Sequence, residues 1–146
     1  MSQRYDVIIL GAGPAGLTAA IYLGRNRLKP LVVDTGSAGG QMVLSYVVAN
    51  YPGVETSSGR DISQTMLRQA RSFGAEVLTQ ATVTELDLTG ETKRVTIDDE
   101  GEFEAPVVIV ATGGTPRQLG LESEQRLKGR GISYCATCDG DFFTDK

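Results

Sequence analysis

The chain contains no histidine and only two cysteines among its 146 residues. A zinc site usually takes four ligands, and His and Cys supply most of them in structural sites. Carboxylates would have to complete any set that the two cysteines begin, because the usual second pair of ligands is missing. The composition therefore argues against a zinc protein, and we expect no metal site.

The sequence also lacks a block of basic residues and any long apolar run. It has 14 Lys and Arg against 18 Asp and Glu, a net charge of −4. Nucleic-acid binding relies on a basic patch, so no nucleic-acid partner is expected. The apolar runs at 7–10 and 107–110 are far shorter than the roughly 20 residues of a membrane-spanning helix, and the N-terminus shows no leader pattern. We therefore expect a cytoplasmic protein without a membrane partner.

Glycine, in contrast, is abundant, with 18 residues, and the first motif is built from it. Residues 5–10 are an apolar run suited to a buried parallel strand. Residues 11–16 read GAGPAG, 15–25 favour a helix, and 31–33 form a second apolar run that ends at Asp34. In a G-x-G-x-x-G turn the glycines allow a tight turn and close approach of a pyrophosphate, which the helix N-terminus attracts. An acidic residue about 20 positions later binds ribose hydroxyls.

This pattern predicts a dinucleotide site with Asp34 on the ribose. The competing interpretation is a glycine-rich turn that binds nothing. The fingerprint by itself does not distinguish FAD from a nicotinamide nucleotide.

The remaining pattern predicts an α/β fold. Residues 35–58 read as an irregular, glycine-punctuated segment, which in a compact domain is usually functional. An amphipathic helix is expected over 61–73, where four apolar side chains recur at spacings of four and three: Ile62, Met66, Ala70 and Phe73. We predict a doubly wound, Rossmann-like, mostly parallel sheet with an antiparallel β insertion at about 82–104.

Within the insertion, Leu86 and Leu88, then Val95 and Ile97, alternate as in strands with one wet face. Residues 107–111 return to a buried strand. The predicted domains are 1–116, for the cofactor, and 117–146, the start of a second domain.

Cys135 and Cys138 are separated by two residues and can be interpreted in three ways. They could bind metal, form a structural disulfide or act as a redox dithiol. The ligand count argues against metal, and a reducing compartment argues against a structural disulfide. The redox dithiol fits best. Asp139, next in the chain, would serve as a helix N-cap, as a proton donor and acceptor for the dithiol, or as both.

Together these motifs resemble the low-molecular-weight, flavin-dependent thioredoxin reductases. The similarity is spread over the whole chain: DVIILGAGPAGL at 6–17, GGQM at 39–42, NYPG at 50–53, ATG at 111–113 and GRGISYCATCDG at 129–140. The last of these is the most specific. The resemblance implies a flavoprotein oxidoreductase with FAD as cofactor.

The resemblance also implies roles for individual residues. The residues implied to contact FAD are Gly11, Gly13, Pro14 and Ala15 at the pyrophosphate, Asp34 and Thr35 at the adenosine ribose, Gly39, Gly40, Gln41 and Asn50 toward the flavin ring, Val83 at the adenine, and Ala111, Thr112 and Gly113 packed against the cofactor.

In such enzymes electrons pass from NADPH through FAD to the dithiol and then to thioredoxin. By resemblance Cys138 faces the flavin, Cys135 attacks the thioredoxin disulfide and Asp139 moves the proton. Family members are commonly homodimers. They also carry a nicotinamide site after the CxxC, so a complementary C-terminal half is expected as a partner.

Three alternatives keep the same motifs. The electron donor could be ferredoxin or a reduced deazaflavin, or the chain could belong to the flavoprotein subunit of a peroxide-reducing system. It could also be a non-catalytic FAD-binding or nucleotide-binding fragment or subunit.

Overall fold

The computed structural model describes residues 2–128, 130–136 and 140. Contacts divide the chain into two units, Met1–Gly113 and Gly114–Lys146.

The first unit is built on a parallel sheet. Its strands are β2 (Val7–Leu10), β3 (Pro30–Asp34), β4 (Glu76–Thr79) and β8 (Val107–Val110), in the order β4-β3-β2-β8. The central strands β2 and β3 are apolar along nearly their whole length because both of their faces are covered. The predicted α/β fold with a parallel sheet is confirmed.

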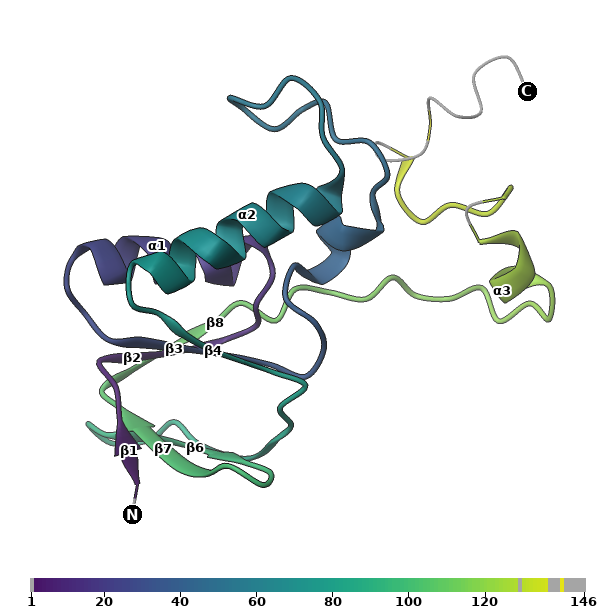
Figure 1. Cartoon of the computed structure of the whole chain (residues 1–146). Coiled ribbons are helices and arrows are strands. Elements are labelled where there is room, and N and C mark those ends of the chain that lie inside the picture. The colour runs from purple at the N-terminus through teal and green to yellow at the C-terminus, as the bar shows by residue number, and fades with distance from the viewer. Residues whose placement is uncertain (1, 129, 137–139, 141–146) are drawn as a thin grey trace. The chain divides into compact units, whose positions relative to one another are not determined.

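Two helices cover one face of this sheet, α1 (Pro14–Arg25) and α2 (Gly59–Ser72) (Figure 1). Helix α2 begins at Ser58, whose Oγ accepts a hydrogen bond from the Asp61 N–H at 3.0 Å. Its apolar stripe faces the sheet as predicted, with Ile62, Met66 and Ala70 buried.

The prediction for Phe73 was wrong. Its side chain is 43% exposed, because it lies at the C-cap of α2, where the helix has ended. The ring packs instead under the guanidinium of Arg25, at 5.9 Å.

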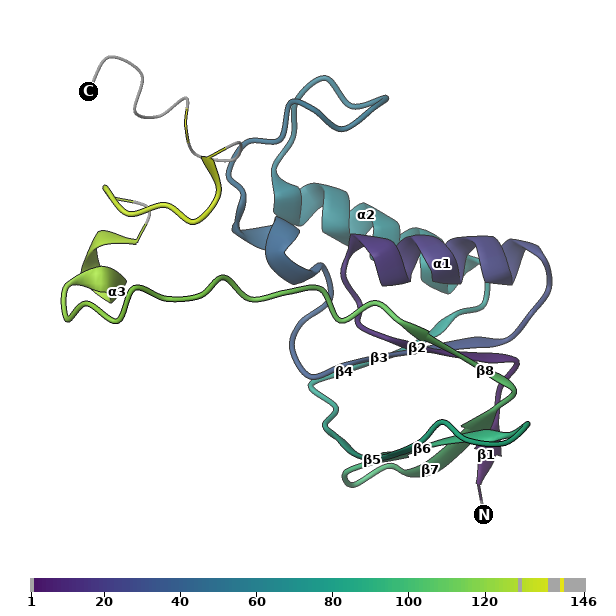
Figure 2. The ribbon, with the colours of Figure 1, turned by 180° about the vertical axis from the view of Figure 1, so that it is seen from behind.

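A second sheet covers the other face (Figure 2). It consists of β1 (Gln3–Arg4), β5 (Val83–Asp87), β6 (Lys93–Ile97) and β7 (Gly101–Ala105), in the order β1-β7-β6-β5. Strands β5, β6 and β7 are antiparallel, which confirms the predicted insertion, whereas β1 pairs in parallel with β7. The space between the sheets is filled from both sides by buried side chains: Tyr5, Ile8, Leu10, Leu31, Val33, Ala81, Val95, Ile97, Phe103 and Ala105.

The expectation of a buried face over Leu86 and Leu88 was wrong, and Leu88 lies beyond the end of β5. Val95 and Ile97 on β6 are buried, but Leu86 and Leu88 are 49% and 43% exposed. Strand β5 forms the edge of the sheet, and its register shifts between Val83 and Glu85. An edge strand with such an irregularity does not keep its alternate side chains over the shared core.

A short 3₁₀ helix, η1 (Gly40–Leu44), lies in the segment predicted to be irregular. In the second unit, helix α3 (Glu124–Leu127) is followed by a bridge between Lys128 and Ile132. Glu124 is buried, and its carboxylate accepts hydrogen bonds from three backbone N–H groups of residues 119–121, at 2.8 to 3.3 Å. Across the residues that the structure describes, no helix is long and apolar enough to cross a membrane.

Candidate cofactor site

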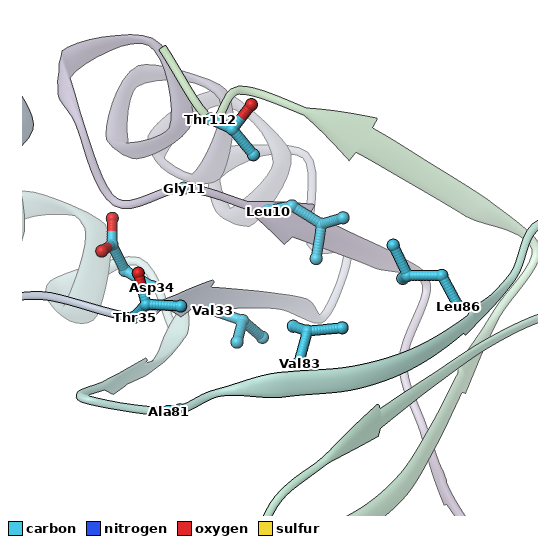
Figure 3. Close-up of a pocket in the computed structure, with 9 residues that line it drawn as sticks. All are labelled: Leu10, Gly11, Val33, Asp34, Thr35, Ala81, Val83, Leu86 and Thr112. Carbon is cyan, nitrogen blue, oxygen red and sulfur yellow. The ribbon is translucent and has the colours of Figure 1, made fainter. Parts of the chain in front are cut away.

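A cavity of about 220 Å³ opens at the carboxyl ends of the parallel strands. Ligands of α/β sheets bind at this edge. Figure 3 shows residues of both sheets around it, with Leu10 of β2 and Val83 of β5 pointing into the space between the sheets. The lining consists of Leu10, Gly11, Val33, Asp34, Thr35, Ala81, Val83, Leu86 and Thr112.

Gly11, which begins the glycine turn, lies directly against the start of the segment after β8. Its N–H donates to the Val33 carbonyl at 2.7 Å, and its φ is +109°. A Cβ atom at this position would lie 2.2 Å from the carbonyl oxygen of Ala111. Both the backbone conformation and the contact therefore require glycine, and this close approach brings Thr112 to the cavity.

The carboxylate of Asp34 joins the two loops that border the cavity. Its Oδ2 accepts the Ala12 N–H at 2.6 Å, and its Oδ1 accepts the Gly36 N–H at 2.7 Å. Each oxygen has a further lone pair that can accept a ligand hydroxyl. Asp34 thus holds the glycine turn and the loop after β3 in place, and it can still bind a ribose.

Helix α1 starts at the glycine turn. Its N-cap is Gly13, which has no side chain to cap the first turn, and Pro14 occupies the first helical position. The free N–H groups of a first turn and the helix dipole attract an anion. Gly13, Pro14 and Ala15 therefore fit a pyrophosphate.

The second predicted loop packs beside this turn. The Gly39 N–H donates to the Ala12 carbonyl at 2.8 Å, and a Cβ atom on Gly40 would lie 3.1 Å from the Cα atom of Gly13. Gln41 follows in η1 with its side chain exposed, and Asn50 is exposed in the loop between η1 and α2.

The structure thus brings five predicted residues to one cavity: Gly11, Asp34, Thr35, Val83 and Thr112. Gly13, Gly39 and Gly40 contact the glycine turn or each other through backbone atoms but do not line the cavity. The other predicted residues outside its lining are Pro14, Ala15, Gln41, Asn50, Ala111 and Gly113. Sequence reasoning missed the apolar lining. Leu10 and Val33 could have been found as the last apolar residues before Gly11 and Asp34, but Ala81 and Leu86 carry no local signal.

The redox motif lies in the second unit. Cys135 is disulfide-bonded. Its N–H donates to Ser133 Oγ at 3.1 Å, and that hydroxyl donates back to the Cys135 carbonyl at 3.2 Å. Cys138 and Asp139 lie outside the described residues, so their predicted roles stay predictions. In the described part of the chain, no group of three or more His, Cys, Asp or Glu side chains is placed to hold a metal ion.

Comparison with known proteins places the chain in a family. The chain is 45% identical to a thioredoxin reductase of Peptoclostridium acidaminophilum over 146 residues, which is 99% of this chain and 46% of that protein. It is 46% identical to a thioredoxin reductase of Listeria monocytogenes, covering 97% of this chain and 44% of the relative. The crystal structure of a thioredoxin reductase from Streptococcus pyogenes superposes with a TM-score of 0.86 at 38% identity, over 98% of this chain and 46% of that one.

The chain therefore spans about half the length of the relatives it matches. The model of the pyridine nucleotide-disulphide oxidoreductase family matches residues 5–146. The chain belongs to the pyridine nucleotide-disulphide oxidoreductase family.

Proposed function

We propose that the chain is the FAD-binding and dithiol-bearing part of a flavin-dependent thioredoxin reductase. The observation that carries the proposal is the link between Asp34 and Ala12. It joins the acidic residue at the end of β3 to the glycine turn beside the cavity. The same carboxylate borders the cavity, and each of its oxygens keeps a lone pair that can accept a ligand hydroxyl.

The cavity fits the adenosine part of FAD. Leu10, Val33, Ala81 and Val83 supply apolar contacts for a flat base, and Asp34 accepts ribose hydroxyls. The lining of the cavity contains no Lys or Arg. This favours FAD over NADPH at this site, because a 2′-phosphate is usually bound by a basic side chain.

The pyrophosphate would lie at the first turn of α1, and Gln41 and Asn50 would lie toward the flavin ring. When bound at these residues, FAD would supply two-electron chemistry, through which a nicotinamide donor would reduce the Cys135–Cys138 disulfide to two thiols. In this proposal the Met1–Gly113 unit holds the cofactor, and residues 114–146 begin the redox part.

The cysteines then carry the exchange. The thiolate of Cys135 attacks the disulfide of a thioredoxin-like protein, forming a mixed disulfide and releasing one partner thiolate. Cys138 attacks Cys135 in that mixed disulfide, which re-forms the Cys135–Cys138 bond and releases the second thiolate. Asp139 moves the proton. The partner leaves with two electrons and two protons, and we propose that the whole protein works as a cytoplasmic homodimer.

FAD titration of the complete protein that contains this chain tests the cofactor site. We expect Asp34→Ala to weaken FAD binding by about 10- to 100-fold, since it removes a ribose acceptor and the acceptor of the Ala12 N–H. Asp98→Ala, which removes an exposed carboxylate on the turn after β6, is the matched control. Equal affinity of both variants would rule out the proposed site.

The electron path is tested in the same protein. NADPH should bleach the flavin absorbance, and Cys138→Ser should abolish thioredoxin reduction while leaving the flavin bound. Bleaching by reduced ferredoxin but not by NADPH would replace the proposed donor with ferredoxin. Unchanged turnover of Cys138→Ser would exclude the dithiol path.

A further inference from the structure

Helix α2 contacts η1 through backbone atoms. A Cβ atom on Gly59, the first residue of α2, would lie 1.8 Å from the carbonyl oxygen of Met42 and 2.8 Å from its carbonyl carbon. The Gly59 N–H also donates to the Ser45 carbonyl at 2.9 Å, just after η1 ends. A backbone carbonyl cannot turn aside as a flexible side chain can, so any larger residue at position 59 must displace η1.

Ser63, one turn further along α2, lies against Gly39, the residue just before η1. Its side chain is fully buried, and its Oγ donates to the Gly59 carbonyl at 2.7 Å. A Cβ atom on Gly39 would lie 2.7 Å from the Ser63 Cβ and 2.8 Å from its Oγ. Ser63 thus occupies the space beside Gly39, whose φ of +119° also favours glycine.

Gly39 and Gly40 connect this contact to the predicted pyrophosphate turn. The Gly39 N–H donates to Ala12, and Gly40 lies against Gly13. A continuous series of backbone contacts therefore runs from the start of α2, through η1, to the glycine turn. Gln41 belongs to the middle of that series, one residue before Met42.

We propose that Gly59 and Ser63 are positioning residues for the flavin end of the cofactor. They lie outside the cavity lining and act through residues 39–42, fixing Gln41 relative to the pyrophosphate turn. This inference rests on the proposed function, because it assumes that FAD is the ligand. It adds that side-chain size at positions 59 and 63 of α2 affects binding of the flavin half of FAD. Binding of the ADP half depends instead on Asp34 and the glycine turn.

Measuring the binding of FAD and of ADP separately distinguishes effects on the flavin half from effects on the ADP half. We expect Ser63→Val to weaken FAD binding by about 10-fold, because a displaced loop loses its geometry toward the flavin. Binding of ADP should change by less than about 2-fold, since its predicted contacts on Asp34 and α1 are unaltered. The absorption spectrum of bound flavin should also shift, as its surroundings at Gln41 change. Gly59→Ala should act in the same direction, with Gly114→Ala as its control because that position has open space.

Ser72→Val is the matched control, because it makes the same chemical change as Ser63→Val at an exposed position of α2, so its FAD affinity and spectrum should match the wild type. All measurements use the complete protein, and thermal unfolding is recorded for each variant.

Equal loss of FAD and ADP binding in Ser63→Val would show that α2 merely supports the fold, and would overturn the inference. Unchanged FAD binding and spectrum in Ser63→Val and Gly59→Ala would overturn it as well. If Ser63→Val does not fold, Gly59→Ala and Ser63→Thr are measured in its place against the same expectation. A wild-type protein that binds no FAD would instead contradict the proposed function, and this inference with it.

Discussion

The parallel sheet and the second sheet share one core, yet only the parallel sheet has central strands buried on both faces. Strands β2 and β3 place apolar side chains toward the helices and toward the second sheet alike. The second sheet buries Val95, Ile97 and Phe103 on one face. Its other face carries a row of charges across all four strands.

The difference explains where the candidate site lies. Parallel strands all end at the same edge, so Gly11, Asp34 and Thr112 come together there without any contact between distant side chains. The second sheet contributes only Val83 and Leu86, plus Ala81 just before β5, and these close the cavity from one side. We infer that the parallel sheet supplies the polar groups of the candidate site, whereas the second sheet supplies part of its apolar lining and stabilises the unit.

Phe103→Ala is the strongest test of that division. Phe103 is 1% exposed and packs between the sheets, so its truncation should lower the free energy of unfolding by about 3–5 kcal/mol. Urea unfolding measures this loss. Because Phe103 does not line the cavity, the FAD affinity of protein that remains folded at low temperature should stay within about 3-fold of wild type, far below the effect of Asp34→Ala. A loss as large as that of Asp34→Ala would mean that the second sheet contributes more to binding than the apolar lining at Val83 and Leu86.

Much of this division could be predicted from the sequence, because it depends on local patterns. The apolar runs of β2 and β3, the glycine turn and the position of Asp34 are all short-range features. Helix η1 was missed, since its position depends on contacts of Gly59 and Ser63 with distant backbone. Leu86 was misassigned because the sequence does not reveal that β5 is an edge strand. The hydrogen bond between Asp34 and Ala12 could not be predicted either, because the spacing predicts an acidic residue near the turn but not a hydrogen bond from the turn to that residue.

Tyr5 tests the connection between the sheets. Its N–H donates to the Glu104 carbonyl of β7, and its hydroxyl donates to Glu76 of β4 at 2.6 Å. Burial, and then the hydrogen bond and charge of Glu76, raise the pKa of Tyr5 well above its usual value. The folded state therefore favours the neutral phenol. Tyrosine in an unfolded chain ionises at about pH 10. The stability that the raised pKa of Tyr5 contributes is therefore complete below about pH 10 and is lost as the pH rises further.

We expect Tyr5→Phe to lower the free energy of unfolding by about 1 kcal/mol at neutral pH, through the lost hydrogen bond. The variant should also lose less stability than wild type between about pH 9 and pH 11, because it has no phenol to ionise at this position. Urea unfolding at both pH values measures the two effects. Parallel pH dependence of the two proteins would show that Tyr5 is not the group that titrates.

The charged row on the outer face should have the smallest effect. Glu104 lies 3.6 Å from Arg4 and 3.3 Å from Arg94, and Arg94 lies 4.0 Å from Asp87. Hydrogen bonds from the side chain and the backbone N–H of Thr89 lower the pKa of Asp87, which favours its charged form. The two arginines are exposed whereas the Glu104 side chain is only 16% exposed, so salt screens these pairs in part. Glu104→Gln should therefore cost about 0.5 kcal/mol at low ionic strength and less at about 1 M salt. Its FAD affinity should equal that of wild type at both salt concentrations. A salt-dependent change in FAD binding would instead connect this face to the cavity, and the separation of roles between the two sheets would have to be abandoned.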